Sequence, residues 1–403
     1  MKILITGAGI GGLTAALALL RRGFQVEVLE QADALREIGA GVQISANGMR
    51  VLADLGVAEA VLALAARPSH REVRLWNTGQ AWVSFDLGAA SLERYGQPYV
   101  TLYRPDLIAV LEAAVRAADP HCIRLGQKAM GCTQDARCAT LHLADGVRVT
   151  GDALIGADGI HSAIRATLHG PSRAEFTGCV AWRGVIPAEA LPPHLAAPVA
   201  ANWVGPGRHV VHYPLRGGAL VNVVGVVERE DWLEEGWNTP GTHAAMRADF
   251  AGWHADVQTL INAIPQPFLW ALKLRQPLSR WTQGRITLLG DACHPTLPFM
   301  AQGAVMAIED GLVLARALHA IADVPDVPEA LMAYDEAVRY ERTSRVVQGS
   351  AANTRRYHNP ILGDPARAAG HVESELAAAP AMERFDWLYR HDATTTPIPR
   401  GSP

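Results

Sequence analysis

Residues 207–218, GRHVVHYPLRGG, place two histidines and a tyrosine within one extended segment. Histidine and tyrosine side chains can accept and donate protons, so this segment has the residues for acid–base chemistry. Successive side chains of a strand point to opposite faces, which puts His209 and Tyr213 on one face and His212 on the other. Half-buried strand residues with ordinary hydrogen-bond partners would give the same pattern, so the rest of the chain has to decide between the two interpretations.

A second group of residues, near the N-terminus, has the spacing of a nucleotide site. A short apolar strand (residues 2–6) leads into GAGIGG and then into a helix rich in Ala and Leu (residues 13–22). The glycines allow a tight turn, close approach of the backbone to a pyrophosphate and close helix packing, and the acid after the next strand (residues 24–29) can bind a ribose hydroxyl. This pattern predicts a dinucleotide site without distinguishing NAD from FAD. The residues that carry it are Gly7, Gly9, Gly12 and Glu30.

Two later segments repeat the order of strand, turn and helix. In DALIGADGIHSAIR (residues 152–165) an apolar strand runs into an Asp-Gly turn, and in GRITLLGDACHPTLPFMAQGAVMAIEDG (residues 284–311) a strand runs into Gly-Asp, a loop and a long helix. The glycine motif, Asp-Gly and Gly-Asp, in this order, resemble the three motifs of the single-component (group A) FAD-dependent aromatic hydroxylases, a family that includes salicylate hydroxylase. The resemblance covers essentially the whole chain.

This resemblance implies a set of cofactor contacts. In the family, the glycine motif binds the ADP half of FAD, the Asp-Gly motif takes part in FAD and NAD(P)H binding, and the Gly-Asp motif holds the ribityl chain. An arginine before a helix contacts the flavin, and the positive end of the helix after the third motif can stabilise negative charge on a reduced flavin. The implied residues beyond the first motif are Arg104, Asp158, Gly159, Gly290, Asp291 and Gly303.

The local pattern around the opening segment is most similar to 3-hydroxybenzoate 6-hydroxylases and 6-hydroxynicotinate 3-monooxygenases, which share His-x-x-x-Tyr at this strand. The resemblance implies that His209 and Tyr213 deprotonate and anchor a phenol, and it places Gln302 in the active site, with helix capping as the structural alternative. Where the hydroxynicotinate enzymes have histidines, this chain has Gln43 and Phe299, which disfavours a pyridine substrate.

The implied activity is an NAD(P)H- and O2-dependent hydroxylation of a small phenolic carboxylate. The first expectation is 3-hydroxybenzoate to gentisate, para to the hydroxyl, through a flavin hydroperoxide; salicylate 1-hydroxylase (decarboxylating) and 6-hydroxynicotinate 3-monooxygenase stay open. A redox-inactive dinucleotide-binding sensor is the alternative from another class, but it would not need the proton-handling pair. A plain NAD dehydrogenase would have no use for the Gly-Asp motif. The choice between NADH and NADPH, and the group that binds the substrate carboxylate, stay open.

Composition limits the classes of partner that the protein is expected to bind. A formal charge of −4 over 403 residues, without a run of basic residues, argues against nucleic acid. Five cysteines without paired spacing fit reduced thiols in the cytoplasm and imply no metal site. The apolar stretch after Lys2 contains the glycine motif, so we expect no membrane span there. The acidic run at residues 228–235 is interpreted as a solvated loop.

The expected fold is α/β, with a Rossmann-like FAD-binding domain, an inserted antiparallel substrate sheet and a helical C-terminal region, as in para-hydroxybenzoate hydroxylase. We expect residues 1–173 and 275–327 to form the FAD-binding domain, with residues 71–100 joining the substrate sheet of residues 174–274. The helical region of residues 328–403 would either cover the flavin domain or form a homodimer face.

Overall fold

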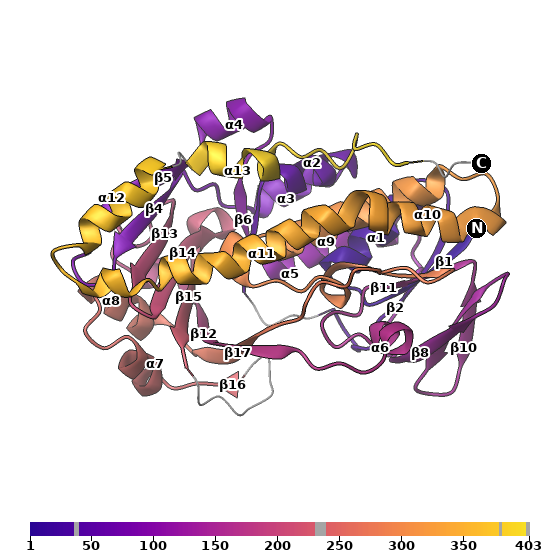
Figure 1. The fold of residues 1–403 in the computed structure, drawn as a ribbon, viewed down its shortest axis with the longest axis horizontal. Helices are drawn as coiled ribbons and strands as arrows, with labels where there is room; N and C mark the ends of the chain where they lie inside the picture. The colour runs from indigo at the N-terminus through magenta and orange to yellow at the C-terminus, as the bar shows by residue number, and fades with distance from the viewer. Residues whose placement is uncertain (36–39, 230–238, 379–380, 400–403) are drawn as a thin grey trace.

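The computed structural model describes residues 1–35, 40–229, 239–378 and 381–399 (Figure 1). A parallel sheet with the strand order β18-β11-β1-β2-β7 forms the nucleotide-binding part. Its central strands are almost wholly apolar because both faces are covered, as parallel sheets require. The strands are β1 (Lys2–Thr6), β2 (Gln25–Leu29), β7 (Ile123–Arg124), β11 (Ala153–Gly156) and β18 (Ile286–Leu288).

Helix α1 lies at the centre of the helices beside this sheet, packed against α5 and α9. Its sequence, IGGLTAALALL, has no charged residue, and a helix that is apolar all round is buried on all sides. The helices in this part are α1 (Ile10–Leu20), α2 (Ala46–Asp54), α3 (Ala58–Leu64), α5 (Arg104–Ala118), α6 (Ala163–His169) and α9 (Gly303–His319). Two smaller sheets adjoin them: β3 (Gly41–Ile44) with β6 (Val100–Tyr103), and β8 (Ala129–Gln134), β9 (Ala139–Leu143) and β10 (Arg148–Gly151).

The second large sheet has the order β16-β17-β12-β15-β14-β13-β4-β5 and is antiparallel except for the parallel pair β13 and β4. Strands β14 and β15 form a hairpin connected by residues 216–218. The strands are β4 (His70–Leu75), β5 (Ala81–Asp86), β12 (Glu175–Pro187), β13 (Val199–Gly205), β14 (Arg208–Leu215), β15 (Leu220–Glu228), β16 (Thr239–Pro240) and β17 (Phe268–Leu274). Since β12 begins and β17 ends next to the expected boundaries, we propose residues 174–274 as the inserted unit, joined by β4 and β5.

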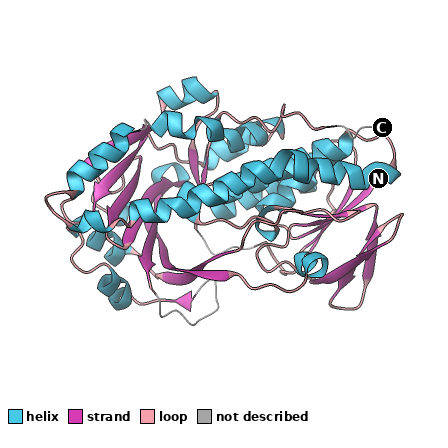
Figure 2. Ribbon diagram, in the orientation of Figure 1, coloured by secondary structure: helices cyan, strands magenta, loops and turns pink. Residues whose placement is uncertain are grey.

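The two faces of this sheet have different neighbours. One face packs through Trp182 and Trp203 against α7 (His243–Asp249) and α8 (Ala255–Ala263). The other face meets α11 (Tyr340–Tyr357), the long helix that runs from beside α9 to the large sheet (Figure 2). The remaining helices are α4 (Ala89–Tyr95), α10 (Val327–Tyr334), α12 (Ala368–Ala378) and α13 (Ala381–Tyr389).

No helix among the described residues is both long and apolar enough to cross a membrane. All five cysteines are free thiols, and four of them are buried. Within the described ranges, no three His, Cys, Asp or Glu side chains are grouped in a way that would hold a metal ion. Of the acidic run, Glu228 ends β15, whereas residues 230–235 lie outside the part of the chain that the structure describes.

Candidate active site

The three sequence motifs meet at one edge of the parallel sheet. Gly7 follows β1, Asp158 lies two residues beyond β11, and Gly290 lies two residues beyond β18. The strands run parallel, so their carboxyl ends lie side by side, which is where ligands bind in open α/β sheets. Segments that are more than a hundred residues apart in the sequence therefore form one site.

The glycine motif has the geometry that a pyrophosphate needs. Gly7 has φ +92°, and a Cβ there would lie 2.5 Å from the Ala157 carbonyl oxygen, while one at Gly12 would lie 2.0 Å from the Gly7 carbonyl oxygen. These two glycines are therefore required by the turn and by helix packing. A Cβ at Gly9 would meet no atom within 4 Å. The backbone at Gly9 thus faces open space into which a ligand can approach.

That open space is a cavity of about 360 Å³ lined by all three of the predicted elements: glycines, acid and Asp-Gly turn. Helix α1 begins at its wall with no acidic residue in the first turn and no side-chain cap, so its positive end is available to a phosphate. The Glu30 carboxylate also lines it and accepts hydrogen bonds from the Ala8 N–H at 2.7 Å and the Ala32 N–H at 2.9 Å. These bonds fix the carboxylate toward the cavity wall. The residues present fit the ADP half of FAD.

Asp158 holds the second turn in place. Its carboxylate accepts from the Ser162 hydroxyl at 2.5 Å and from the Ala163 N–H at 2.8 Å, and so fixes the start of α6. Burial raises the pKa of Asp158, although these hydrogen bonds act in the opposite direction. Gly159, with φ +74°, lines the cavity, and a Cβ there would meet nothing within 4 Å. Asp158 shapes the turn, and Gly159 leaves space beside it.

At the third motif, Gly290 takes φ +63°, and its N–H donates to Asp310 at 3.1 Å. Asp291 is exposed, yet enough protein surrounds it that desolvation raises its pKa, while electrostatic interactions with His294 and Arg104 oppose this shift. Arg104, the first residue of α5, therefore lies within electrostatic reach of Asp291. The structure brings together these two predicted flavin-site residues from the two separate segments of the FAD-binding part.

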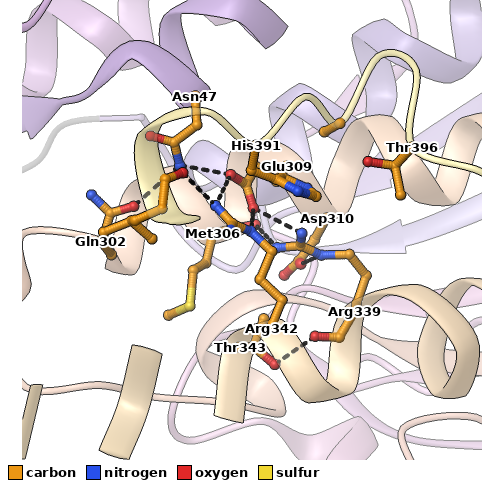
Figure 3. A network of polar contacts seen from close by, with 12 residues as sticks. Asn47, Gln302, Met306, Glu309, Asp310, Arg339, Arg342, Thr343, His391 and Thr396 are labelled. Carbon is orange, nitrogen blue, oxygen red and sulfur yellow. Dashed lines mark hydrogen bonds and ion pairs between the residues drawn. The ribbon is translucent and has the colours of Figure 1, made fainter. Parts of the chain in front are cut away.

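A buried network of charges, not found by the sequence analysis, supports the third motif (Figure 3). Two adjacent acids in the middle of α9 form its centre, and none of their side chains is exposed. Asp310 accepts from Gly290, from His294 Nε2 at 2.6 Å and from Arg339 Nε at 2.7 Å. Glu309 accepts from Arg339 at 2.8 Å and from Arg342 at 2.8 Å. The network fixes the Gly-Asp loop to α9.

Gln302 belongs to the same network. It is buried at the N-cap of α9, where its Nε2 donates to the Ser45 hydroxyl at 3.0 Å and its Oε1 accepts from Asn47 Nδ2 at 3.3 Å. Asn47 in turn donates to Glu309 at 2.7 Å (Figure 3). Gln302 makes no side-chain cap of its helix. These bonds give it a positioning role, and its contact with substrate stays a prediction. Gly303 begins α9 as expected.

The large sheet presents His209 and Tyr213 on the face that meets the FAD-binding part, as strand alternation predicts. The ring of His209 packs edge-on against Phe299, in the loop between the third motif and α9, with ring centroids 5.0 Å apart. His212 lies on the opposite face, where its Nδ1 accepts from the Trp203 indole N–H at 3.4 Å. Of the two histidines, only His209 is thus directed toward the cofactor motifs.

Tyr213 contacts a different segment of the FAD-binding part. A Cβ at Gly41 of β3 would lie 2.6 Å from the Tyr213 ring, so the ring lies directly against that backbone. Burial raises the pKa of Tyr213, while a hydrogen bond with Gln43 opposes this shift, and the phenol stays protonated at neutral pH. Gln43 also accepts from the Tyr99 hydroxyl at 2.6 Å.

Between these two side chains the sheet face is only partly covered. Val211 lies midway between His209 and Tyr213 and pairs with Val224 of β15. Both valines are only half-buried, although they lie in the middle of an eight-stranded sheet. Apolar residues at such a position are normally fully buried. The two valines thus leave part of the sheet face between His209 and Tyr213 accessible.

Comparisons with known proteins agree with this geometry. Residues 1–350 match the FAD binding domain family. The chain is 38% identical over 392 residues to a 3-amino-4-hydroxybenzoate 2-monooxygenase of Streptomyces platensis, covering 97% of this chain and 96% of that protein. It is 37% identical over 395 residues to a 3-hydroxybenzoate 6-hydroxylase of Polaromonas naphthalenivorans (96% of both chains). It is 36% identical over 384 residues to a 6-hydroxynicotinate 3-monooxygenase of Bordetella bronchiseptica (94% and 99%).

Solved structures give the same result. The fold matches Klebsiella pneumoniae HpxO, solved with FAD and uric acid, with a TM-score of 0.81 at 27% identity over 96% of both chains. A salicylate hydroxylase substrate complex matches with a TM-score of 0.81 at 27% identity, over 98% of this chain and 96% of that one.

The chain therefore belongs to the FAD binding domain family. Within it, the protein is a flavoprotein monooxygenase of the aromatic hydroxylase class, with FAD as its cofactor and NADH or NADPH, typical of this family, as the reductant. The predicted fold class and enzyme class are confirmed.

Gly9→Val is expected to weaken FAD binding by more than tenfold without unfolding the protein. The added side chain meets no protein atom near its Cβ but projects toward the cavity that the glycine motif lines. FAD fluorescence titration of the apoprotein measures the affinity, and the urea midpoint of the apoprotein measures stability. Gly370→Val, also in open space but in α12, is the matched control. Unchanged FAD affinity in Gly9→Val would contradict the assignment of this cavity.

Proposed function

We propose that this enzyme hydroxylates a small phenolic carboxylate para to its hydroxyl group, with 3-hydroxybenzoate, converted to gentisate, as the substrate. The observation that carries the proposal is the position of His209 and Tyr213 on one face of β14, on either side of the half-buried Val211. A strand rises about 3.3 Å per residue, so their Cα atoms are about 13 Å apart. This distance leaves room for one aromatic ring between the two side chains.

The two side chains have complementary roles in this proposal. Burial keeps the pKa of His209 well below its usual value, so its imidazole is neutral and can accept the phenol proton. Removal of that proton makes the ring carbons ortho and para to the oxygen nucleophilic. Tyr213 stays protonated and donates a hydrogen bond that orients the substrate.

The cofactor contributes the redox chemistry. When bound, FAD supplies electrons from NADH or NADPH to O2 and one oxygen atom to the ring. Gly7, Gly9 and Glu30 would hold its ADP half, and Asp291 and Arg104 would lie beside the flavin end. The protein's own task is to bind the phenol, exclude water and remove the proton.

A second candidate substrate is 3-amino-4-hydroxybenzoate. A relative named for that activity is 38% identical to this chain over 97% of its length, and this substrate is also a phenol with a carboxylate. Salicylate and 6-hydroxynicotinate complete the set of substrates to test. The glutamine at position 43 and the phenylalanine at position 299, in place of histidines, disfavour the pyridine.

The test is to mix the purified holoenzyme with NADH, O2 and each of these four compounds in turn, and to identify products by mass while following NADH and hydrogen peroxide. We expect 3-hydroxybenzoate to gain one oxygen and to accelerate NADH oxidation. A hydroxylated product from 3-amino-4-hydroxybenzoate alone, or carbon dioxide from salicylate, would move the assignment to that compound. If none of the four changes, the substrate proposal fails and the enzyme class stands.

A further inference from the structure

A chain of three proton-handling groups leads from His209 to the protein surface. His209 Nδ1 lies 2.6 Å from His358 Nε2, and His358 Nδ1 lies 2.8 Å from Glu228 Oε1. His209 is 2% exposed and the His358 side chain 1%, whereas the Glu228 side chain is 53% exposed. The chain therefore begins in the buried face that meets the flavin-site loops and ends in solvent.

Backbone bonds hold the three groups together although they come from separate elements. The Gly207 N–H donates to the His358 carbonyl at 3.1 Å, and the Glu228 N–H donates to the Gly207 carbonyl at 3.0 Å. These bonds tie the start of β14 and the end of β15 to His358, the residue that follows the last turn of α11. The alignment of the three side chains thus rests on fixed backbone rather than on mobile surface groups.

The carboxylate sets the direction of the hydrogen bonds. An ionised Glu228 can only accept, so His358 carries its proton on Nδ1 and its Nε2 accepts from His209 Nδ1–H. His209 Nε2 is then unprotonated and able to take a proton. The tautomer that general-base action requires is therefore the one that Glu228 imposes through His358.

We propose, on the basis of the proposed function, that His209, His358 and Glu228 form a relay that carries the substrate's phenolic proton to solvent. The phenol O–H proton moves to His209 Nε2, the Nδ1 proton of His209 moves to His358 Nε2, and the Nδ1 proton of His358 moves to the Glu228 carboxylate and then to water. Each ring gains one proton and loses one, so neither histidine stays charged. Transfer in the reverse direction, from His209 Nε2 to the phenolate of the hydroxylated product with uptake of a proton from water through Glu228, returns both rings to their starting tautomers. No electrons are transferred.

The relay avoids a lasting positive charge on a buried histidine. Desolvation, together with the neighbouring His358, holds the pKa of His209 well below its usual value, so an imidazolium there is unfavourable. Burial also lowers the pKa of His358, while the bond to Glu228 opposes this shift. A proton taken from the phenol is therefore passed on rather than stored. His358 and Glu228 are positioning residues, since neither touches the reacting atoms.

The groups packed around the relay leave its direction unchanged. Cys179 of β12 stands opposite Glu228, and burial raises its pKa to about 11, so it is a neutral thiol at physiological pH. Tyr357 of α11 contacts the His209 ring with centroids 5.3 Å apart. Two cations are adjacent to relay residues along the chain: Arg208 donates to the Asp249 backbone carbonyl, and Arg229 forms an ion pair with the Asp249 carboxylate at 3.5 Å.

The test compares holoenzyme variants Glu228→Gln and His358→Gln, using whichever phenol the wild type hydroxylates. We expect kcat at pH 7 to fall about tenfold and about 100-fold respectively, as for lost acid–base assistance, with KM changed less than threefold. The deficit should shrink as pH approaches the pKa of the free phenol, about 10. Glu175→Gln, an exposed glutamate of β12, is the matched control.

A Glu228→Gln variant whose pH profile coincides with that of the wild type would overturn the relay. Because the Glu228 side chain is exposed, misfolding would not explain a change in this variant. A substrate-independent readout separates this failure from a failure of the proposed function. Nitrogen-15 NMR of the histidine rings should show protons on Nδ1 of both His209 and His358 in the wild type. A proton on His358 Nε2 there would contradict the relay even if no phenol is turned over.

Discussion

His209→Gln is expected to lower the rate of phenol hydroxylation at pH 7 by about 10²- to 10⁴-fold, the usual range for loss of a general base. Glutamine keeps the size and polarity of the side chain but cannot take a proton. As the pH rises toward the pKa of the phenol, the substrate ionises by itself, so the loss should become smaller. NADH oxidation and product formation, measured from pH 6 to about 10, give this profile.

His212→Gln is the matched control for that variant. It changes the same residue type on the same strand, but His212 lies on the opposite face, beside Trp203, and burial lowers its pKa to about 3. Its kcat per folded enzyme should equal that of the wild type, with thermal stability recorded alongside. Equal activity losses in the two variants would mean that the strand, rather than the imidazole at position 209, is responsible.

Arg339→Met is expected to destabilise the protein by about 3–5 kcal/mol, since removal of one partner leaves buried charges uncompensated. The guanidinium is fully buried and donates to Glu309 at 2.8 Å and to Asp310 at 2.7 Å. FAD affinity should fall as well, because Asp310 also holds the Gly290 N–H. The urea midpoints of the apoprotein and FAD titration measure the two effects.

The effect of Arg339→Met should depend on pH. In the wild type, burial alone would raise the pKa of Glu309, but Arg342 and Arg339 lower it overall. The pKa of Asp310 is likewise lowered overall, because His294 and Arg339 outweigh the effect of burial. Because the pKa values of these two carboxylates are lower in the folded than in the unfolded protein, they stabilise the fold above the unfolded pKa of about 4. This stabilisation is lost as pH falls through the pKa values of the folded protein. In the variant the carboxylate pKa values rise, so protonation relieves the penalty and the gap to wild type should narrow between pH 7 and 5.

Arg345→Met, six positions further along the chain in α11, provides the comparison. Arg345 is exposed and lies over the Trp387 ring at 3.9 Å, a contact of about 0.5–1 kcal/mol. The difference between its urea midpoint and that of the wild type should be small and should not change with pH. If Arg339→Met behaves in the same way, the buried network does not hold the Gly-Asp loop.

Much of the site could be predicted because its motifs are local. The turn after β1 needs glycine at positions 7 and 12 for steric reasons that act within a few residues, and the alternation along β14 places His209 and Tyr213 without knowledge of any other strand. Such features depend on backbone geometry, which a short sequence encodes.

The rest of the site depends on contacts between distant residues. His209 and His358 are 149 positions apart, and Glu309 and Arg339 are 30 apart, so no spacing rule connects them. One signal was present: the adjacent acids in AIEDG lie among apolar residues of a helix whose basic residues, Arg316 and His319, are confined to its last turn, and buried acids require cationic partners. Which arginines would supply them could not be found without the packing of α11 against α9.

Synthesis of the chain delivers the acids of α9 before their counterions. At about 5–20 residues per second, Arg339 follows Glu309 by about 2–6 seconds, and during that time burial of α9 would leave both carboxylates without arginine. Final docking of α9 onto the nucleotide-binding sheet must therefore wait for Arg339 and for the start of α11, which carries Arg342. The N-terminal portion of a nascent chain, although it carries all three cofactor motifs, becomes able to hold FAD only after Arg339 and Arg342 have been synthesised.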